Sequence, residues 1–412
     1  MVADYRAILR EHWGFPDFRG IQRETIESIG AGKDTLGLMP TGGGKSITFQ
    51  VPALAMEGVC LVITPLISLM KDQVDHLRRR GIRAAAIHAG MQRSDIVQTL
   101  ENAVFGGVKL LYISPERLGS ELFLAKLRHM RVSFVTVDEA HCISQWGYDF
   151  RPSYLEIAKI RQLLPEIPIL ALTATATPAV VEDIQRQLQF RTPNVYKMSF
   201  ARANLSYIVR RTMDKEAELV HILRQTSGSS IVYTRSREAT RELAKMLMQQ
   251  GISATWYHAG LEPSVKEERQ NLWQTDKVRV MVATNAFGMG IDKPDVSMVI
   301  HPDAPNSIEE YFQEAGRAGR DGNQAYAVLL YEEDDAYKLK CRVASSFPEK
   351  ELIRTIYDQI AYFFVVGVGC GAGHTFEFSL ERFCRAYRHF PTQVHTSLEL
   401  LQRAGYIYYD PN

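Results

Sequence analysis

The sequence predicts an α/β protein in which two tandem parallel-sheet domains, at residues 1–197 and 198–338, precede a small helical module at residues 339–412. In both domains, short β-branched runs alternate with amphipathic helical patterns, which is typical of parallel sheets covered by helices. Segments also repeat at one offset of 170 residues (61 to 231), and this repeat predicts two related units. The matching segments are Leu61–Thr64 with Ile231–Thr234, Gly81–Gly90 with Gly251–Gly260, and Val108–Lys109 with Val278–Arg279.

The composition favours a multidomain protein that does not enter a membrane. A chain of 412 residues with 46% hydrophobic content exceeds what one core usually supports. It contains no run of about 18 apolar residues, and the first residues lack the apolar segment of a signal peptide. We therefore expect a soluble, cytoplasmic protein, associated with the nucleoid if the source is bacterial. The net charge of +1 implies that a polyanion would bind through local patches.

A phosphate-binding loop is predicted between the strand Thr35–Leu38 and a helix that begins near Ile47. Three glycines let backbone N–H groups turn toward phosphate oxygens, Lys45 supplies a positive charge for the β and γ phosphates, and Ser46 can ligate magnesium. The usual pattern has glycine where this chain has Met39, so the match is incomplete. The loop residues are Thr41, Gly42, Gly43, Gly44, Lys45 and Ser46.

Two adjacent carboxylates follow the apolar run Val135–Val137. We predict that Asp138 holds the metal and that Glu139 polarises the water that attacks the γ-phosphate. Alone, such a pair is more often a solvated strand end. Together with the glycine loop 93 residues upstream (45 to 138), it indicates a nucleoside triphosphatase.

The second domain lacks a phosphate loop of its own, because the repeat offset carries Lys45 to Lys215, where no glycines cluster. Arg317 and Arg320, three residues apart, are expected on one helix face, from which they would stabilise charge on the γ-phosphate across a cleft. The alternative is a surface helix with solvated arginines. A glycine-rich loop containing Gly288 follows a predicted strand and could report the nucleotide state.

Taken together, these motifs resemble the superfamily 2 helicases, and most closely the RecQ DNA helicases, over about residues 5–335. The resemblance implies two RecA-like domains that bind ATP and Mg²⁺. It implies that Gln22 reads adenine, since its amide can bond both N6 and N7, while Phe15 and Arg19 enclose the ring. The further helicase motifs that it implies are Asp138 to His141, Thr173 to Thr175, and Gln313 to Arg320. Gly288, Asp292 and Gln313 are also expected to bind the nucleotide.

The segment from Cys142 to Pro152 resembles the aromatic-rich loop that senses single-stranded DNA in the RecQ family. Trp146 and Phe150 offer ring faces for stacking on bases, worth about 1–3 kcal/mol per base, and Arg151 offers a cation. Ordinary packing of these aromatic residues in the core is the alternative. The resemblance also implies DNA contacts by Thr64, Arg117 and His258, although turn structure accounts equally well for the first two.

Beyond about residue 338 the chain departs from the RecQ pattern, which has four clustered cysteines on zinc. Cys341, Cys370 and Cys384 are far apart and form no close pair, so we expect no zinc. The pattern predicts helices at 348–364, 379–387 and 393–404 and then an aromatic strand at 406–409, as in a winged helix. Such a module binds DNA or only braces its neighbour, and the chain could be part of a longer protein.

The sequence as a whole predicts an ATP-dependent DNA helicase that moves 3′ to 5′ along one strand, unwinds tailed duplexes and serves DNA repair or recombination. Two alternatives stay open. One is an RNA helicase, and the other is a nucleic-acid clamp or annealing factor that uses ATP only as a conformational switch.

Overall fold

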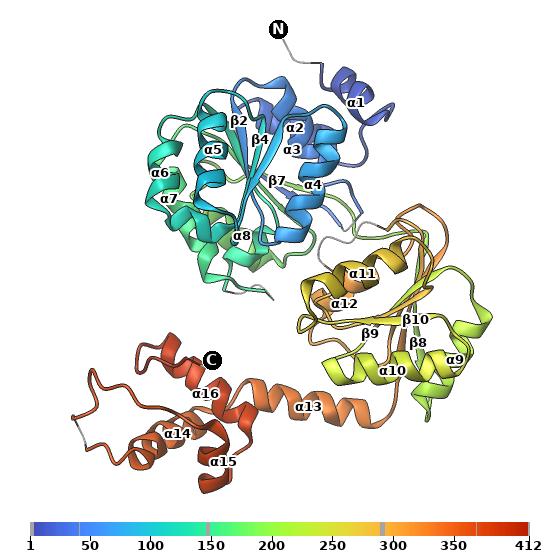
Figure 1. The fold of residues 1–412 in the computed structure, drawn as a ribbon, viewed down its shortest axis with the longest axis vertical. Coiled ribbons are helices and arrows are strands. Elements are labelled where there is room, and N and C mark those ends of the chain that lie inside the picture. The colour runs from blue at the N-terminus through green and yellow to red at the C-terminus, as the bar shows by residue number, and fades with distance from the viewer. Residues whose placement is uncertain (1–3, 41, 146–148, 289–292, 368, 411–412) are drawn as a thin grey trace. The chain divides into compact units, whose positions relative to one another are not determined.

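The computed structural model describes residues 4–40, 42–145, 149–288, 293–367 and 369–410. The chain divides into two compact units, residues 1–330 and 331–412. Figure 1 shows both units, the first of which contains two separate sheets. Within the described ranges, no helix is both long and apolar enough to cross a lipid bilayer.

The first sheet contains seven strands among the described residues, in the order β3-β4-β2-β5-β6-β1-β7, and each pair of neighbours is parallel. Its strands are β1 (Thr35–Leu38), β2 (Val59–Ile63), β3 (Ala84–Ile87), β4 (Leu110–Ile113), β5 (Val132–Val137), β6 (Ile169–Thr173) and β7 (Val195–Lys197). Every residue of the central β1, β2, β5 and β6 is buried, as expected for strands covered on both faces.

Helices cover the two faces of this sheet (Figure 1). The α-helices are α1 (Tyr5–Trp13), α2 (Gln22–Gly30), α3 (Ile47–Ala55), α4 (Ile67–Arg79), α5 (Arg93–Val104), α6 (Glu121–Leu127), α7 (Ala158–Leu163) and α8 (Pro178–Gln187). Short 3-10 helices occur at η1 (Pro115–Gly119), η2 (Ala140–Ile143) and η3 (Pro152–Ile157). One apolar core includes Leu100 of α5 and Ile184 of α8, and a second includes Phe49 of α3 and Met70 of α4. The sheet is thus buried between two helical layers.

The second sheet has the order β10-β11-β9-β12-β13-β8 among the described residues, and its neighbours from β10 to β13 pair in parallel. Its strands are β8 (Leu205–Arg211), β9 (Ser229–Tyr233), β10 (Ala254–Tyr257), β11 (Val280–Ala283), β12 (Val296–His301) and β13 (Ala325–Tyr331). The accompanying helices are α9 (Lys215–Gln225), α10 (Arg237–Gln249), α11 (Pro263–Gln274) and α12 (Ile308–Ala315).

The repeat predicted from the sequence is confirmed element by element. Strands β2, β3 and β4 recur as β9, β10 and β11, each 170 residues later (59 to 229, 84 to 254, 110 to 280). Helices α4 and α5 recur as α10 and α11 at the same offset (67 to 237, 93 to 263). The order β3-β4-β2-β5 in the first sheet corresponds to β10-β11-β9-β12 in the second. The two sheets are therefore related units.

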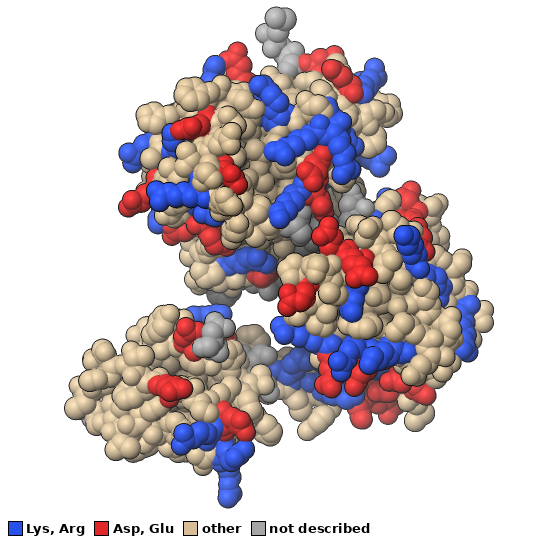
Figure 2. All heavy atoms as spheres, in the orientation of Figure 1, with Lys and Arg blue, Asp and Glu red and all other residues tan. Residues whose placement is uncertain are grey.

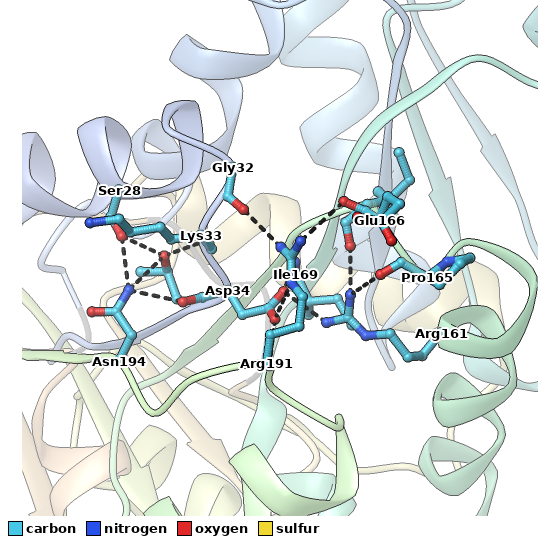
Figure 3. Close-up of polar contacts among 12 residues, drawn as sticks. Ser28, Gly32, Lys33, Asp34, Arg161, Pro165, Glu166, Ile169, Arg191 and Asn194 are labelled. Atoms are coloured by element: carbon cyan, nitrogen blue, oxygen red, sulfur yellow. Dashed lines mark hydrogen bonds and ion pairs between the residues drawn. The ribbon is translucent and has the colours of Figure 1, made fainter.

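Asp34, which immediately precedes β1, anchors the base of the first sheet (Figure 3). Its side chain is 1% exposed and accepts hydrogen bonds from Arg161 Nη2 at 2.7 Å, the Ile169 N–H at 2.9 Å and the Arg191 N–H at 2.9 Å. Burial alone would raise the pKa of Asp34, but the hydrogen bonds from Arg191 and Arg161 hold it below its usual value. These bonds join α7, the start of β6 and the segment before β7 at the end of the sheet opposite the phosphate loop.

The C-terminal unit contains α13 (Asp334–Ser346), α14 (Lys350–Phe363), α15 (Leu380–Tyr387) and α16 (Pro391–Arg403). The three helices predicted from the sequence are confirmed with slightly shifted ends, and α13 was not predicted. Ile356, Phe383 and Val394 are completely buried in a core that also contains Cys384. The unit is a small helical domain packed around aromatic side chains.

The aromatic strand predicted at residues 406–409 is wrong, because these residues form no strand. A strand needs a neighbour to satisfy its backbone, and none lies beside this segment among the described residues. Tyr409 is instead held by local contacts: its N–H donates to Gln402 Oε1 at 2.7 Å, and its hydroxyl lies 3.0 Å from His395 Nδ1. The segment is an extended tail on α16.

Candidate nucleotide and DNA site

The loop between β1 and α3 has the backbone of a phosphate-binding loop. Gly42 and Gly44 have φ values of 82° and 75°, a region that side chains rarely tolerate, and the Gly43 N–H donates to Pro40 O at 2.9 Å. Lys45 and Ser46 follow at the start of α3. Thr41 lies outside the described residues. The glycines are needed for the shape of this loop.

Gln22, at the start of α2, packs directly on the loop. Its Nε2 donates to Gly43 O at 3.3 Å and Gly44 O at 3.2 Å, and its Oε1 accepts from the Arg19 N–H at 2.9 Å. A Cβ added to Gly44 would lie 2.3 Å from this Nε2, so close contact requires glycine there. Arg19 lies over the Phe15 ring, with 5.7 Å between guanidinium and ring centroid. The structure thus groups the three residues that the sequence assigned to adenine.

The two carboxylates that follow β5 face Lys45. Lys45 Nζ lies 3.2 Å from Glu139 Oε1, and the two side chains are only 17% and 13% exposed. Glu139 has a φ of 48°, an uncommon conformation for a non-glycine residue, and its N–H donates to Asp138 Oδ1 at 3.0 Å. The strained backbone therefore turns the second carboxylate toward the lysine.

The charges of this cluster shift one another's pKa values. Burial raises the pKa of Asp138 to about 6, although Lys45 opposes the shift. Burial also opposes ionisation of Glu139, but Lys45 and His141 hold its pKa below the usual value. Burial disfavours the charge on Lys45, yet Glu139 and Asp138 raise its pKa. The site therefore holds a charged Lys–Glu pair beside a carboxylate that gains from a cation.

His141 connects this cluster to the end of β6. Its Nδ1 lies 2.9 Å from Thr173 Oγ1 and 3.5 Å from Glu139 Oε2. Burial lowers the pKa of the imidazole. Tyr154, which no sequence motif singled out, is fully buried and donates to the Asp138 carbonyl at 3.0 Å. Its only signal was its place shortly after Arg151 and Pro152.

The expectation that Arg317 and Arg320 share a helix face is wrong. Helix α12, which carries Gln313, ends at Ala315, and both arginines lie in the turns that follow. The reason is glycine: Gly319 has a φ of 63°, and its N–H donates to Val296 O at 2.8 Å instead of continuing the helix. The arginines are thus positioned by a turn that is bonded to the second sheet.

Both arginines nevertheless interact electrostatically with Glu139 or Lys45 of the phosphate site. Arg317 lowers the pKa of Glu139, and Arg320 opposes the raised pKa of Lys45. A Cβ added to Gly42 would lie 3.4 Å from Arg320 Cγ, and one added to Gly288 would lie 2.5 Å from Arg317 Nη2. Arg317 also donates to the Gly288 carbonyl. Asp292 lies outside the described residues.

The proposed DNA contacts are more scattered. Trp146 lies outside the described residues, and Phe150 is half-buried. Arg151 is ion-paired with Asp149 at 3.0 Å. Arg117 Nη2 donates to His88 O at 2.8 Å, and Thr64 is 1% exposed, so neither side chain is presented freely to a ligand.

His258 lies among basic residues of the second sheet's surface. Burial lowers its pKa, and so do the nearby Arg237, Arg269, Lys266 and Arg241. Figure 2 shows Lys and Arg side chains gathered where α10, which carries two of these arginines, lies in Figure 1. Elsewhere on the face shown, charges of both signs are interspersed, in keeping with the net charge of +1.

Comparison with known proteins agrees with this geometry. Residues 19–184 match the family model "DEAD/DEAH box helicase", and residues 214–322 match "Helicase conserved C-terminal domain". The chain is 47% identical over 329 residues to the ATP-dependent DNA helicase RecQ of Pasteurella multocida, covering 80% of this chain and 52% of that protein. It is 45% identical to the RecQ of Bacillus subtilis over 81% of this chain and 57% of that protein. The chain belongs to the RecQ family of superfamily 2 helicases.

A solved structure extends the likeness of fold. The helicase Lhr of Mycobacterium smegmatis, bound to single-stranded DNA and AMP-PNP, has a TM-score of 0.64 and 20% identity, covering 96% of this chain and 57% of that chain. The predicted pair of RecA-like domains followed by a helical region is confirmed. This RecQ-family chain spans about half the length of the curated relatives it matches.

Proposed function

We propose that this chain is an ATP-dependent DNA helicase that couples ATP hydrolysis to 3′-to-5′ movement on single-stranded DNA and to the unwinding of tailed duplexes, in DNA repair or recombination. The observation that carries the proposal is the approach of Lys45 Nζ to Glu139 Oε1 at 3.2 Å, beside Asp138 and on a phosphate loop. Family membership supports DNA as the nucleic acid, and with it a location inside the cell.

In the proposed mechanism, the loop N–H groups and Lys45 bind the β and γ phosphates of ATP. When phosphate arrives, Lys45 exchanges its contact with Glu139 for the phosphate oxygens. This exchange frees Glu139 to orient a water for in-line attack on the γ-phosphate. The ion pair between Lys45 and Glu139 holds both groups at the site.

Ser46 and Asp138 suit a hard cation, because hydroxyl and carboxylate oxygens are the ligands that Mg²⁺ prefers. The observation that fits a cation is the donor set itself, with the Ser46 hydroxyl at the start of α3 and the Asp138 carboxylate directly after β5. Bound Mg²⁺ would supply charge neutralisation of the β and γ phosphates. Arg317 and Arg320, both close to the cluster, would stabilise charge that develops on the γ-phosphate.

His141 and Thr173 provide a route between the phosphate site and β6, since Thr173 contacts His141 and His141 contacts Glu139. The segment that includes Phe150 and Arg151 joins the same cluster, because the Arg151 N–H donates to Cys142 O at 2.9 Å. We propose that DNA stacking on Trp146 and Phe150 acts on Glu139 through this connection.

Two further assignments complete the proposal. The domain boundary at 197/198 is supported by β7, which ends at Lys197 in the first sheet. The boundary predicted at 338/339 falls within α13, a helix of the compact unit that begins at residue 331. A helical module without structural zinc is supported by the packing of Cys384 in the apolar core of the module.

A strand-displacement assay tests this function. With ATP and Mg²⁺, the protein should separate a duplex with a 3′ single-stranded tail and leave a duplex with only a 5′ tail intact. The Lys45→Ala variant is the control for contaminating activity. Stronger stimulation of ATPase by RNA than by a matched DNA strand would favour an RNA helicase. DNA binding and annealing without ATP turnover would favour the clamp.

A further inference from the structure

Three side chains next to Lys45, Asp138 and Glu139 carry atoms that bind metals well, and the mechanism above does not use them as metal ligands. A ligand atom of His141, one of Cys142 and one of Asp149 all lie within 4.8 Å of one another. Cys142 Sγ lies 3.7 Å from His141 Nε2 and 3.8 Å from Asp149 Oδ2. In the part of the chain that the structure describes, this is the one such group of His, Cys and acidic residues.

The two spacings from Cys142 Sγ are close to those of a tetrahedral zinc site. Bond lengths of about 2.3 Å to sulfur and 2.0–2.1 Å to nitrogen place the two ligand atoms about 3.6 Å apart. The observed 3.7 Å and 3.8 Å need only small shifts to reach that value. A thiolate, an imidazole and a carboxylate suit Zn²⁺ and leave one position open, whereas Mg²⁺ prefers oxygen ligands.

The surroundings also match those of a metal-ligating histidine. Such a histidine usually donates its second ring N–H to an oxygen, which fixes the tautomer that leaves the other nitrogen for the metal. Here Nδ1 of His141 lies 2.9 Å from Thr173 Oγ1 and 3.5 Å from Glu139 Oε2. The Nε2 on the opposite side of the ring lies next to Cys142.

An ion can reach these three side chains, and neighbouring bonds hold them in place. The side chains of His141 and Cys142 are almost fully buried, but that of Asp149 is 34% exposed, so an ion can enter from its side. The Arg151 N–H donates to Cys142 O at 2.9 Å, and Arg151 pairs with Asp149. These bonds hold the described residues on either side of 146–148 together. Burial raises the pKa of the Cys142 thiol, so a metal must compete with its proton.

We propose that His141, Cys142 and Asp149 form an inhibitory site for Zn²⁺, separate from the Mg²⁺ site of the phosphate loop. Zn²⁺ forms bonds to Sγ, Nε2 and Oδ2, and the thiol proton leaves to solvent. At Oδ2 the ion replaces the hydrogen bonds that Arg151 Nε and Nη2 donate at 3.2 Å and 3.0 Å. The consequence for turnover rests on the proposed function of Glu139. A cation on His141 keeps the proton on Nδ1, which lies 2.9 Å from Thr173 Oγ1 and 3.5 Å from Glu139 Oε2. The added positive charge stabilises the negative charge of Glu139, so this carboxylate orients the attacking water less well.

Direct binding is tested first, because it does not depend on ATP turnover. Co²⁺ is titrated into the metal-free full chain, and visible d–d bands together with a near-ultraviolet thiolate band should appear with one equivalent. Zn²⁺ should then displace the Co²⁺ spectrum. The Cys142→Ser variant should lose the thiolate band and bind Zn²⁺ at least about tenfold more weakly. Mutation even of residues that only hydrogen-bond to metal ligands typically lowers metal affinity by about 10–100-fold.

Cys341→Ser is the matched control, because Cys341 is an exposed cysteine in the C-terminal unit and is not one of the proposed ligands. That variant should keep the spectrum and the affinity of the wild type. Loss of the band in Cys341→Ser, or its persistence in Cys142→Ser, would overturn the proposal. If Cys142→Ser does not fold, absence of a thiolate band in the wild type alone suffices to reject the site.

Inhibition is tested second, with ATP and Mg²⁺ in excess. Micromolar Zn²⁺ should reduce DNA-stimulated ATP turnover of the wild type and of Cys341→Ser, a chelator should restore it, and Cys142→Ser should be resistant. Equal inhibition of all three proteins would reject the inhibitory role. A protein that binds Co²⁺ as expected but shows no ATPase activity even without Zn²⁺ would contradict the proposed helicase function and leave the metal site standing.

Discussion

Replacing Glu139 by glutamine removes one charge from the phosphate site and changes its shape very little. Glu139 Oε1 lies 3.2 Å from Lys45 Nζ, and the glutamate side chain is 13% exposed. A positioned base contributes about 10²–10⁴-fold to turnover, equivalent to about 3–5 kcal/mol of activation free energy. We therefore expect DNA-stimulated ATP turnover of Glu139→Gln to fall by about 10²–10⁴-fold.

The same variant should still bind ATP and remain folded. Ser46 and Asp138 are unchanged, so the proposed Mg²⁺ ligands persist. Breaking a buried ion pair by removing one partner costs about 3–5 kcal/mol, but Asp138 also stabilises the charge on Lys45, so the loss in unfolding free energy should stay below that range. Lys45→Ala, in contrast, leaves two carboxylates without their cation. It should be less stable than Glu139→Gln and bind ATP more weakly.

The measurements are steady-state ATPase with single-stranded DNA, equilibrium binding of a fluorescent ATP analogue, and urea unfolding. Glu101→Gln is a matched control, because Glu101 forms an exposed pair with Lys126 at a similar N–O distance of 3.3 Å. This control should behave as the wild type in all three assays. Near-normal ATP turnover in Glu139→Gln would refute the role of Glu139 in orienting the water. Loss of ATP binding by this variant would refute the claim that Glu139 is needed for hydrolysis but not for binding ATP.

Three further predictions address stability, DNA sensing and zinc. Asp34→Asn should cost about 3–5 kcal/mol of unfolding free energy at pH 7, since Arg161 is left buried without its partner. Because the folded-state pKa of Asp34 is lowered, the stabilisation by its carboxylate is present above about pH 4 and is lost as the pH falls through the folded pKa. The difference between the urea midpoints of wild type and variant should therefore narrow in acid. Trp146→Ala should reduce stimulation of ATPase by single strands and abolish unwinding, with the melting temperature nearly unchanged; a loss of about 3–5 kcal/mol in stability would indicate a core residue instead. Chelator treatment should leave melting and DNA-stimulated ATPase unchanged, and elemental analysis after dialysis should find well under one zinc per chain, whereas zinc retained by the helical module would contradict this expectation.

Much of the candidate nucleotide site could be predicted from the sequence because its residues are contiguous in short motifs. A glycine run between a strand and a helix has few conformations that satisfy its backbone, so Gly42, Gly44 and Lys45 were assigned correctly to one loop. The two related units could be predicted for the same reason. The repeat compares local sequence patterns at a constant offset and does not depend on how the strands pair.

Other features could not be predicted because they depend on contacts between distant segments. The helix at Arg317 was expected from the spacing of two arginines, but a hydrogen bond from Gly319 to Val296 of another strand ends it earlier. The strand at 406–409 was expected from its aromatic residues, but a strand forms only where a partner edge exists. Tyr154 and Cys142 gave little signal, since their importance comes from Asp138 and Asp149 lying beside them.

The sequence by itself determined the α/β class, the two related units and the candidate residues of the phosphate loop, because periodicity and glycine content are local properties of the chain. Only the tertiary structure decided that Lys45 faces Glu139, that Gln22 packs on Gly44, and that His141, Cys142 and Asp149 converge. These arrangements arise because the carboxyl ends of parallel strands meet at one edge of a sheet. Which side chains meet there is set by strand order and loop geometry, which no single segment encodes.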